Sequence, residues 1–254
     1  MMRNRVIINA DDCGISKAVD AEIEKFIQLG KISSTTVMAN MDDLEGAKRL
    51  YELYKDNISF GVHVNLTDGH PLTYSQSLLD YGFFKEDKGK IVLNGYPFIN
   101  KRIPRILHQD VVKECVAQIN CVRDTGIDIS HIDSHHLMLT SSSMTTITPN
   151  VLMQANIKKM RRARNYMDKK SRSFFIRQLW FAYMKLRVKD LKSTDWFEMF
   201  ASYYNIVSNG FCLDGSIELM THPGGCYPKE DELILSLDYK SFFKGFEIIN
   251  YNTI

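Results

Sequence analysis

The stretch RVIINADDCGIS, residues 5–16, combines an apolar run with two adjacent carboxylates and a serine. Its first five residues are rich in β-branched side chains, which is typical of a buried strand. Ser16 is a favourable N-cap for a helix whose apolar side chains recur with helical spacing, and Gly30 is placed to end that helix. The stretch therefore predicts a strand–loop–helix unit with Asp11 and Asp12 at the exit of the strand.

The same alternation of strand and helix patterns continues along the chain. The expected strands are Arg5–Asn9, Ser33–Asn40, Ile58–Leu66, Ile127–Asp133, Ile157–Met160, Leu191–Thr194, Ile217–Thr221 and Gly245–Asn250. The expected helices include Leu44–Tyr54, Val111–Arg123 and Asp231–Leu237. Repeated βα units predict an α/β protein with a parallel sheet, closed into a barrel or a distorted version of one. Because no linker is visible, we expect a single domain over residues 1–254 with an excursion at about 67–105.

The composition is that of an ordinary globular chain, with 254 residues, 44% hydrophobic, 24% charged and a net charge of +2. Near-balanced charge argues against a nucleic-acid partner. The five cysteines show no CxxC spacing, which argues against a disulfide framework or zinc knuckle and favours a reducing cytoplasm. The N-terminus lacks a signal-peptide layout and no run approaches ~18 apolar residues, so we expect a cytoplasmic protein with no membrane partner.

Polar side chains gather where several expected strands end. Asp11 and Asp12 follow the first strand, His63 lies late in the third, and His135 and His222 follow later strands. The histidines expected at this edge are His63, His131, His135, His136 and His222. Taken singly, each residue is explained by a turn or a solvated surface. Taken together, one Asp and two imidazoles form a common ligand set for a divalent ion, and a second carboxylate can act as general base. The residues predict a metal-assisted hydrolase.

Four blocks of the sequence carry a family resemblance. IINADDCGIS, GVHVNLTDGHPL, HIDSHH and ELMTHPGG resemble, in order and approximate spacing, the motifs of the YdjC-like carbohydrate deacetylases. The resemblance implies a single-domain distorted (β/α) barrel that resembles a TIM barrel. It also implies metal-dependent removal of N-acetyl groups from amino sugars or short chitin-type oligosaccharides, and it is compatible with a homodimer.

The resemblance also implies a role for each motif residue. Asp12, His63 and His135 are the expected ligands of one divalent metal ion, Zn²⁺ or Mg²⁺. Asp11 is the expected general base toward a metal-activated water, and His222 is the expected general acid or substrate-orienting group.

Two further residues are expected to contact the substrate or order the site. Arg161 matches an arginine that helps to order such sites, although Arg162 and Arg164 compete for this role, and Asn65 is a second candidate substrate-binding residue. Aromatic side chains of the excursion are candidate stacking partners for a sugar, with core packing as the equal alternative: Tyr74, Tyr81, Phe83, Phe84, Tyr96 and Phe98.

Some features depart from the family pattern. Cys13 replaces a usual phenylalanine, and Leu137 stands where the histidine string often continues. The basic segment 158–192 could bind an acidic or phosphorylated sugar, but a solvated helix face is the favoured interpretation. A metal-dependent phosphoesterase and a carbohydrate-binding protein without turnover remain the alternative functions.

Overall fold

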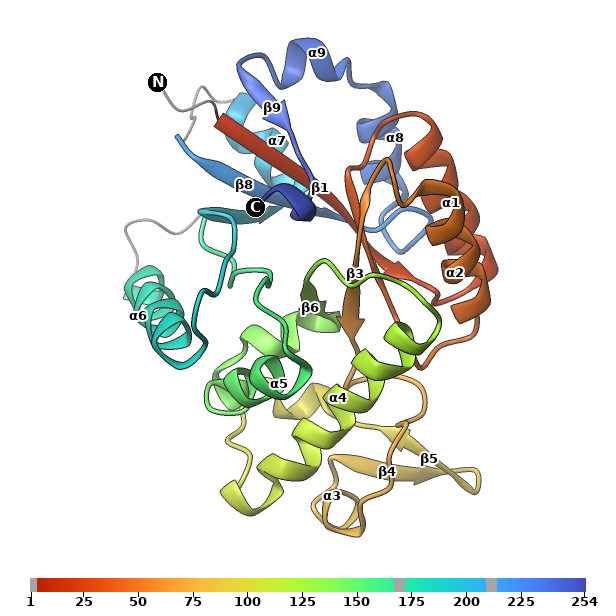
Figure 1. The fold of residues 1–254 in the computed structure, drawn as a ribbon, viewed down its shortest axis with the longest axis vertical. Coiled ribbons are helices and arrows are strands. Elements are labelled where there is room, and N and C mark those ends of the chain that lie inside the picture. The colour runs from red at the N-terminus through yellow and green to blue at the C-terminus, as the bar shows by residue number, and fades with distance from the viewer. Residues whose placement is uncertain (1–3, 167–171, 209–213) are drawn as a thin grey trace.

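The computed structural model describes residues 4–166, 172–208 and 214–254. A parallel sheet runs through the middle of the described chain in the order β6-β3-β2-β1-β8-β7, and β9 pairs with the start of β1. Its strands are β1 (Asn4–Cys13), β2 (Ser34–Val37), β3 (Ser59–Val64), β6 (Ile132–Ser134), β7 (Trp196–Met199), β8 (Ser216–Thr221) and β9 (Phe246–Ile248). The sheet curls, with helices on its outside (Figure 1).

Isolated bridges continue the curl beyond β6. Ile132 pairs in parallel with Met160, and Lys159 pairs with Lys192. Single bridges, and no regular strand, therefore continue the pairing from β6 through residues 159–160 to residue 192. The predicted α/β distorted barrel is confirmed, in the form of a curled half-barrel.

Helices follow most strands. They are α1 (Lys17–Gln28), α2 (Leu44–Tyr54), α4 (His108–Asp124), α5 (Thr148–Ala155), α6 (Arg172–Arg187), α7 (Phe200–Ser208), α8 (Pro228–Ser236) and α9 (Tyr239–Phe242). Helix α1 begins as predicted, because the Ser16 hydroxyl accepts a hydrogen bond from the Val19 amide. Its C-terminal turn is closed by Gly30, whose φ of 64° lies in the left-handed region that glycine favours. Within the described residues, no helix has both the length and the apolar character needed to cross a bilayer.

The excursion after β3 forms its own small structure. It contains α3 (Gln76–Asp80), the hairpin of β4 (Phe84–Asp87) and β5 (Lys90–Leu93), and the short 3-10 turns η1 (Tyr96–Phe98) and η2 (Arg105–Leu107). Phe83, Phe84 and Phe98 are buried, and the rings of Phe83 and Phe98 lie 5.3 Å apart. These three aromatics therefore pack the excursion, whereas Tyr74 and Tyr96 are exposed.

Several predicted strand boundaries were wrong. Strand β1 continues through both aspartates to Cys13, and β6 is shorter than the expected 127–133. The expected strands 157–160 and 191–194 are reduced to the bridges described above, and β7 was missed. Short strands are defined by pairing with distant residues, which local propensity does not record.

Four of the five cysteines lie in the described residues. Cys13, Cys115, Cys121 and Cys226 are free, and Cys212 lies outside the described residues. Residues 167–171 of the basic segment also lie outside them.

Candidate active site

A β-bulge in β1 aims two adjacent carboxylates at one cavity. The register of β1 against β2 shifts between Ala10 and Cys13, and Asp12 adopts a φ of 67°. In a regular strand, neighbouring side chains point to opposite faces, so Asp11 and Asp12 would be separated. The bulge and the left-handed residue remove that alternation, and both side chains line the same cavity. Backbone strain of this kind is typical of functional sites.

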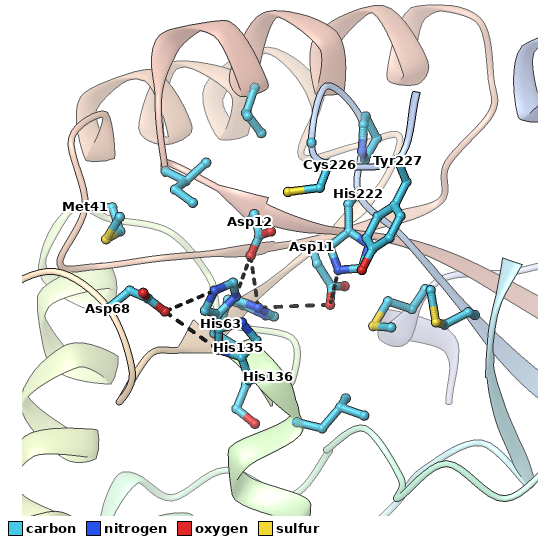
Figure 2. Close-up of a pocket in the computed structure, with 18 residues that line it drawn as sticks. Asp11, Asp12, Met41, His63, Asp68, His135, His136, His222, Cys226 and Tyr227 are labelled. Atoms are coloured by element: carbon cyan, nitrogen blue, oxygen red, sulfur yellow. Dashed lines mark ion pairs between the residues drawn. The ribbon is translucent and has the colours of Figure 1, made fainter. Parts of the chain in front are cut away.

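Asp12 meets two imidazoles, His63 from β3 and His135 from the turn directly after β6 (Figure 2). Its Oδ1 lies 3.2 Å from Nε2 of His63 and 3.0 Å from Nδ1 of His135. One donor atom from each residue lies within 4.8 Å of the others. Asp12 Oδ1 is buried, and apart from these two imidazoles it has no polar partner among the described residues. Burial alone would raise the pKa of Asp12, but the two imidazoles hold it well below its usual range. An ionised carboxylate facing two imidazoles fits a divalent cation.

A second carboxylate orients His63. Asp133 Oδ1 lies 2.7 Å from His63 Nδ1, and the Thr36 hydroxyl lies 3.3 Å from the same nitrogen. Both His63 and Asp133 are almost fully buried. Asp133 holds Nδ1 of His63, and Nε2 faces Asp12. A carboxylate that bonds the far nitrogen of a metal-binding histidine commonly fixes the ring in this orientation.

Asp11 is bound by a buried arginine. Arg161 contacts both carboxylate oxygens, at 2.7 and 2.6 Å, and the Asn9 amide donates a third hydrogen bond at 2.9 Å. Burial alone would raise the pKa of Asp11, but the Arg161 guanidinium outweighs burial and lowers it. Asp11 is thereby kept ionised and fixed in orientation.

Arg161 also joins two other buried carboxylates. Its Nη2 lies 2.8 Å from Asp133, and its Nε donates to Glu218 at 2.7 Å. Tyr251, near the C-terminus, donates from its hydroxyl to the other oxygen of Glu218 at 2.5 Å. Arg161 is 1% exposed and does not line the cavity. Its hydrogen bonds are therefore made to buried carboxylates of the site.

The two competing arginines point elsewhere. Arg162 donates to Gln178 on α6, and Arg164 pairs with Glu198 and donates to Ser202 at 3.1 Å. Among the three arginines considered, Arg161 is the one in contact with the carboxylates of this site.

His222 completes the cavity from the loop after β8. Its Nε2 lies 4.0 Å from Asp11 Oδ2, and its side chain is 18% exposed. The cavity has a volume of about 490 Å³. Met199, Met220 and Tyr227 also line it, and the Tyr227 ring lies 5.6 Å from the His222 ring. The imidazole therefore borders a space large enough for a small ligand, opposite the Asp12–His63–His135 group.

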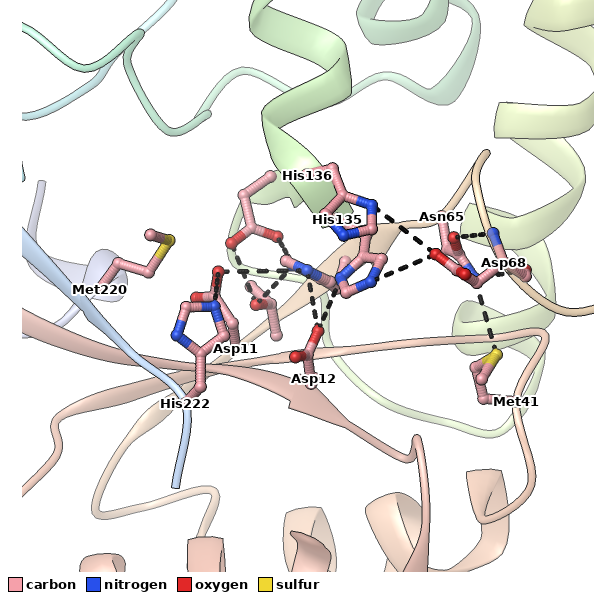
Figure 3. A network of polar contacts seen from close by, with 12 residues as sticks. Asp11, Asp12, Met41, Asn65, Asp68, His135, His136, Met220 and His222 are labelled. Carbon is pink, nitrogen blue, oxygen red and sulfur yellow. Dashed lines mark hydrogen bonds and ion pairs between the residues drawn. The ribbon is translucent and has the colours of Figure 1, made fainter. Parts of the chain in front are cut away.

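His136 was expected at this edge, but sequence reasoning missed its neighbour Asp68 at the rim of the cavity. Asp68 Oδ2 lies 3.5 Å from His135 Nε2 and 3.6 Å from His136 Nδ1 (Figure 3). The Thr67 hydroxyl contacts both Asp68 and His136, at 2.7 and 2.9 Å. His136 has a φ of 52°, which turns its ring toward the cavity. The TDG and SHH strings contained these residues, but the loop contact between them is not visible in the sequence.

Asn65 and His131 do not reach the cavity lining. Asn65 is buried and hydrogen-bonds both the amide and the carbonyl of Asp68, so it supports the rim loop. His131 was expected at the same strand edge, but its ring stacks on Tyr251 at 3.5 Å inside the barrel. It packs against Gly61, where a Cβ atom would lie 2.5 Å from the ring. His131 precedes β6 and therefore lies deeper than His135.

Solved structures share this fold. A protein of Enterococcus faecalis V583, whose proposed role is cleavage of cellobiose phosphate, superposes with a TM-score of 0.78 at 20% identity over 99% of both chains. A CE4 esterase of Streptococcus mutans superposes with a TM-score of 0.51 at 12% identity, over 98% of this chain and 87% of that one. The chain thus belongs to the class of distorted α/β barrels.

The sequence comparison identifies the family within that class. The family described as YdjC-like protein matches residues 5–241, and the chain belongs to it. A carbohydrate deacetylase of Geobacillus stearothermophilus is 35% identical over 130 residues, which cover 51% of this chain and 48% of that protein. The chain therefore spans about half the length of this relative. A carbohydrate deacetylase of Clostridium beijerinckii is 27% identical over 98% of this chain and 100% of that protein.

Proposed function

We propose that this protein is a metal-dependent deacetylase that removes N-acetyl groups from amino sugars or short chitin-type oligosaccharides. One observation carries the proposal: the Asp12–His63–His135 group and the Arg161-bound Asp11 face one cavity. Relatives named carbohydrate deacetylases support the substrate class.

Asp12, His63 and His135 would hold the divalent ion. When bound, such an ion polarises an amide carbonyl and makes a water molecule more acidic near neutral pH. This chemistry is common to Zn²⁺ and Mg²⁺ sites, and the donor set of one carboxylate and two imidazoles suits more than one ion.

Asp11 and His222 would move the protons. Asp11 accepts a proton from the attacking water as a carbon–oxygen bond forms, and Arg161 keeps its carboxylate ionised until then. His222 donates a proton to the sugar nitrogen as the carbon–nitrogen bond breaks. Acetate and a free amine are the products. The apolar side chains Met199 and Met220 also line the cavity and would exclude water around the acetyl group.

Acetate release from N-acetylglucosamine oligomers tests the proposal. We expect release that a chelator abolishes, and a fall of about 10²–10⁴-fold in Asp11→Asn because the general base is lost. Asp56→Asn, an exposed carboxylate on the loop after α2, is the matched control and should retain full activity. Equal turnover by Asp11→Asn and the parent protein would contradict the base assignment.

A metal-dependent phosphoesterase is the second candidate. Asp68, His135 and His136 form another group of donor atoms within 4.8 Å of one another, adjacent to the first, and phosphoesterases often use two ions. Hydrolysis of p-nitrophenyl phosphate without acetate release would favour this function. Sugar binding without turnover under either metal would favour a carbohydrate-binding protein instead.

A further inference from the structure

Helix α6 exposes a stripe of large apolar side chains. Phe175, Ile176, Leu179 and Leu186 are 63%, 57%, 72% and 86% exposed. Their spacing, together with the half-buried Tyr183, places all five on one side of the helix. The basic segment was interpreted as a solvated helix face, but the side that meets solvent here is apolar.

The opposite side of α6 is also apolar and is already packed. Phe181, Met184 and Val188 are at most 4% exposed and belong to the core. A surface helix normally presents charged residues outward, so a second apolar side that faces solvent is unusual. Helix α6 lies at the periphery of the molecule (Figure 1).

The stripe is large enough to indicate a binding surface. The four exposed side chains leave on the order of 500 Å² accessible, if a large apolar side chain offers roughly 150–250 Å². Apolar patches of this size on soluble proteins are often functional.

The segment that carries the stripe is strongly basic. From Lys169 to Lys189 the sequence contains seven Lys and Arg residues and no Asp or Glu. In the described part, Arg187 and Lys189 are exposed at the C-terminal end of the stripe, and the exposed Lys185 lies toward the packed side, with its Nζ 5.2 Å from the centre of the Phe181 ring. Asp168 and Asp190 are the acids that flank this range in the sequence, and Asp190 lies 3.8 Å from Lys158.

We propose that the outer face of α6 docks on the surface of an anionic phospholipid bilayer. Phe175, Leu179 and Leu186 would enter the interface, and the neighbouring cations would meet lipid phosphates. Helices that lie on membranes combine an aromatic and aliphatic side with Lys and Arg in this way. The contact is peripheral, because no helix of the described chain is long and apolar enough to span the bilayer.

A second copy of the chain fits the stripe less well. Two α6 helices placed face to face would bring two basic segments together, and like charges repel. Two stripes would also bury only about 1,000 Å², the lower limit for a specific interface. An anionic bilayer complements both the charge and the apolar side chains.

Vesicle flotation of the full chain tests this proposal. We expect the protein to float with phosphatidylcholine vesicles in which roughly a third of the lipid is phosphatidylglycerol, and not with phosphatidylcholine alone. Leu179→Ser/Leu186→Ser should lower the partition coefficient by tenfold or more, since two inserted side chains are lost. Arg187→Gln/Lys189→Gln should lower it by roughly fivefold per charge.

Ile106→Ser is the matched control. Ile106 is 86% exposed, as Leu186 is, but it lies on η2, and its replacement should leave flotation unchanged. Circular dichroism should show the parent melting temperature for every variant, because each replaced side chain is exposed. Absence of flotation, or an equal loss in Ile106→Ser, would overturn the proposal. Light scattering tests the second copy: a dimer of the parent protein that becomes a monomer in Leu179→Ser/Leu186→Ser would overturn the bilayer proposal.

Discussion

The floor and the rim of the cavity hold their imidazoles in different ways. At the floor, His63 is 1% exposed and lies 2.7 Å from the buried Asp133. At the rim, His135 is 16% exposed and lies 3.5 Å from Asp68, which is itself half exposed. Both imidazoles face the same oxygen of Asp12. The position of His63 in the candidate metal site is therefore fixed by a buried carboxylate, whereas the position of His135 depends on the surface loop that carries Asp68.

The floor is a connected network of buried charges, and the rim is not. Arg161 joins Asp11, Asp133 and Glu218, each at most 2% exposed. A buried charge that loses its partner is costly, so this network resists rearrangement. The rim groups can be solvated by water when their contacts open. We infer that the floor orients the reacting groups and the rim adapts to the ligand.

The largest effect is expected from removing the arginine of the floor. Arg161→Met leaves three buried carboxylates without their cation and should lower the free energy of unfolding by about 3–5 kcal/mol. Urea denaturation measures this change. Arg105→Met, an exposed arginine on η2, should change the same free energy by less than about 0.5 kcal/mol. A stability equal to the parent's in Arg161→Met would show that the network is not a stabilising floor.

The next effect concerns the buried partner of His63. Asp133→Asn weakens the hold on Nδ1 and should reduce Zn²⁺ affinity by about 10–100-fold, as loss of second-sphere carboxylates typically does. Competition with a chromophoric chelator measures the affinity. Asp124→Asn, an exposed carboxylate at the end of α4, serves as the control and should bind Zn²⁺ like the parent.

A smaller loss of stability is expected at Tyr251, which bonds the Glu218 partner of Arg161. Tyr251→Phe removes the hydroxyl that donates to Glu218 and should cost roughly 1–1.5 kcal/mol of unfolding free energy. Thermal denaturation should show a drop of about 2–6 °C for a chain of this length. Tyr74→Phe, at an exposed tyrosine, should have the melting temperature of the parent protein. Equal shifts in the two variants would contradict a stabilising role for the Tyr251 hydroxyl.

The smallest effect is expected at the rim. Asp68→Asn should change Zn²⁺ affinity by less than about threefold, because the half-exposed Asp68 contacts His135 only at 3.5 Å and water can replace it. The same chelator competition compares it directly with Asp133→Asn. Equal losses in the two variants would mean that the two imidazoles are held alike.

Local patterns predicted much of the fold. The Ser16 cap, the left-handed Gly30 and the span of α2 were as expected, because caps and helical periodicity act over a few residues. The strands near residues 157–160 and 191–194 were overestimated, and β7 was missed. Their extent depends on partners far away in the chain.

The sequence predicted most of the residues that form the candidate site, but it did not predict how these residues are arranged. Asp11, Asp12, His63, His135 and His222 were expected at one strand edge, and the structure brings all five to one cavity. Neither the bulge that turns Asp12 inward nor the contacts of the rim loop could be read from the pattern. Arg161 was expected to order the site, but its three carboxylate partners were not foreseen.

The sequence by itself determined which chemical groups the strand ends carry, since alternating βα units place strand ends at one edge. Tertiary structure alone decided how those groups are held. Asp11 and Arg161 are 150 positions apart, and His63 and Asp133 are 70 apart, so their contacts exist only when the sheet curls. Local propensity reaches across a few residues, whereas burial and pairing of charge depend on the whole fold. For this reason NADD at 9–12 indicated two carboxylates, and only the bulge in β1 showed that both face the same cavity.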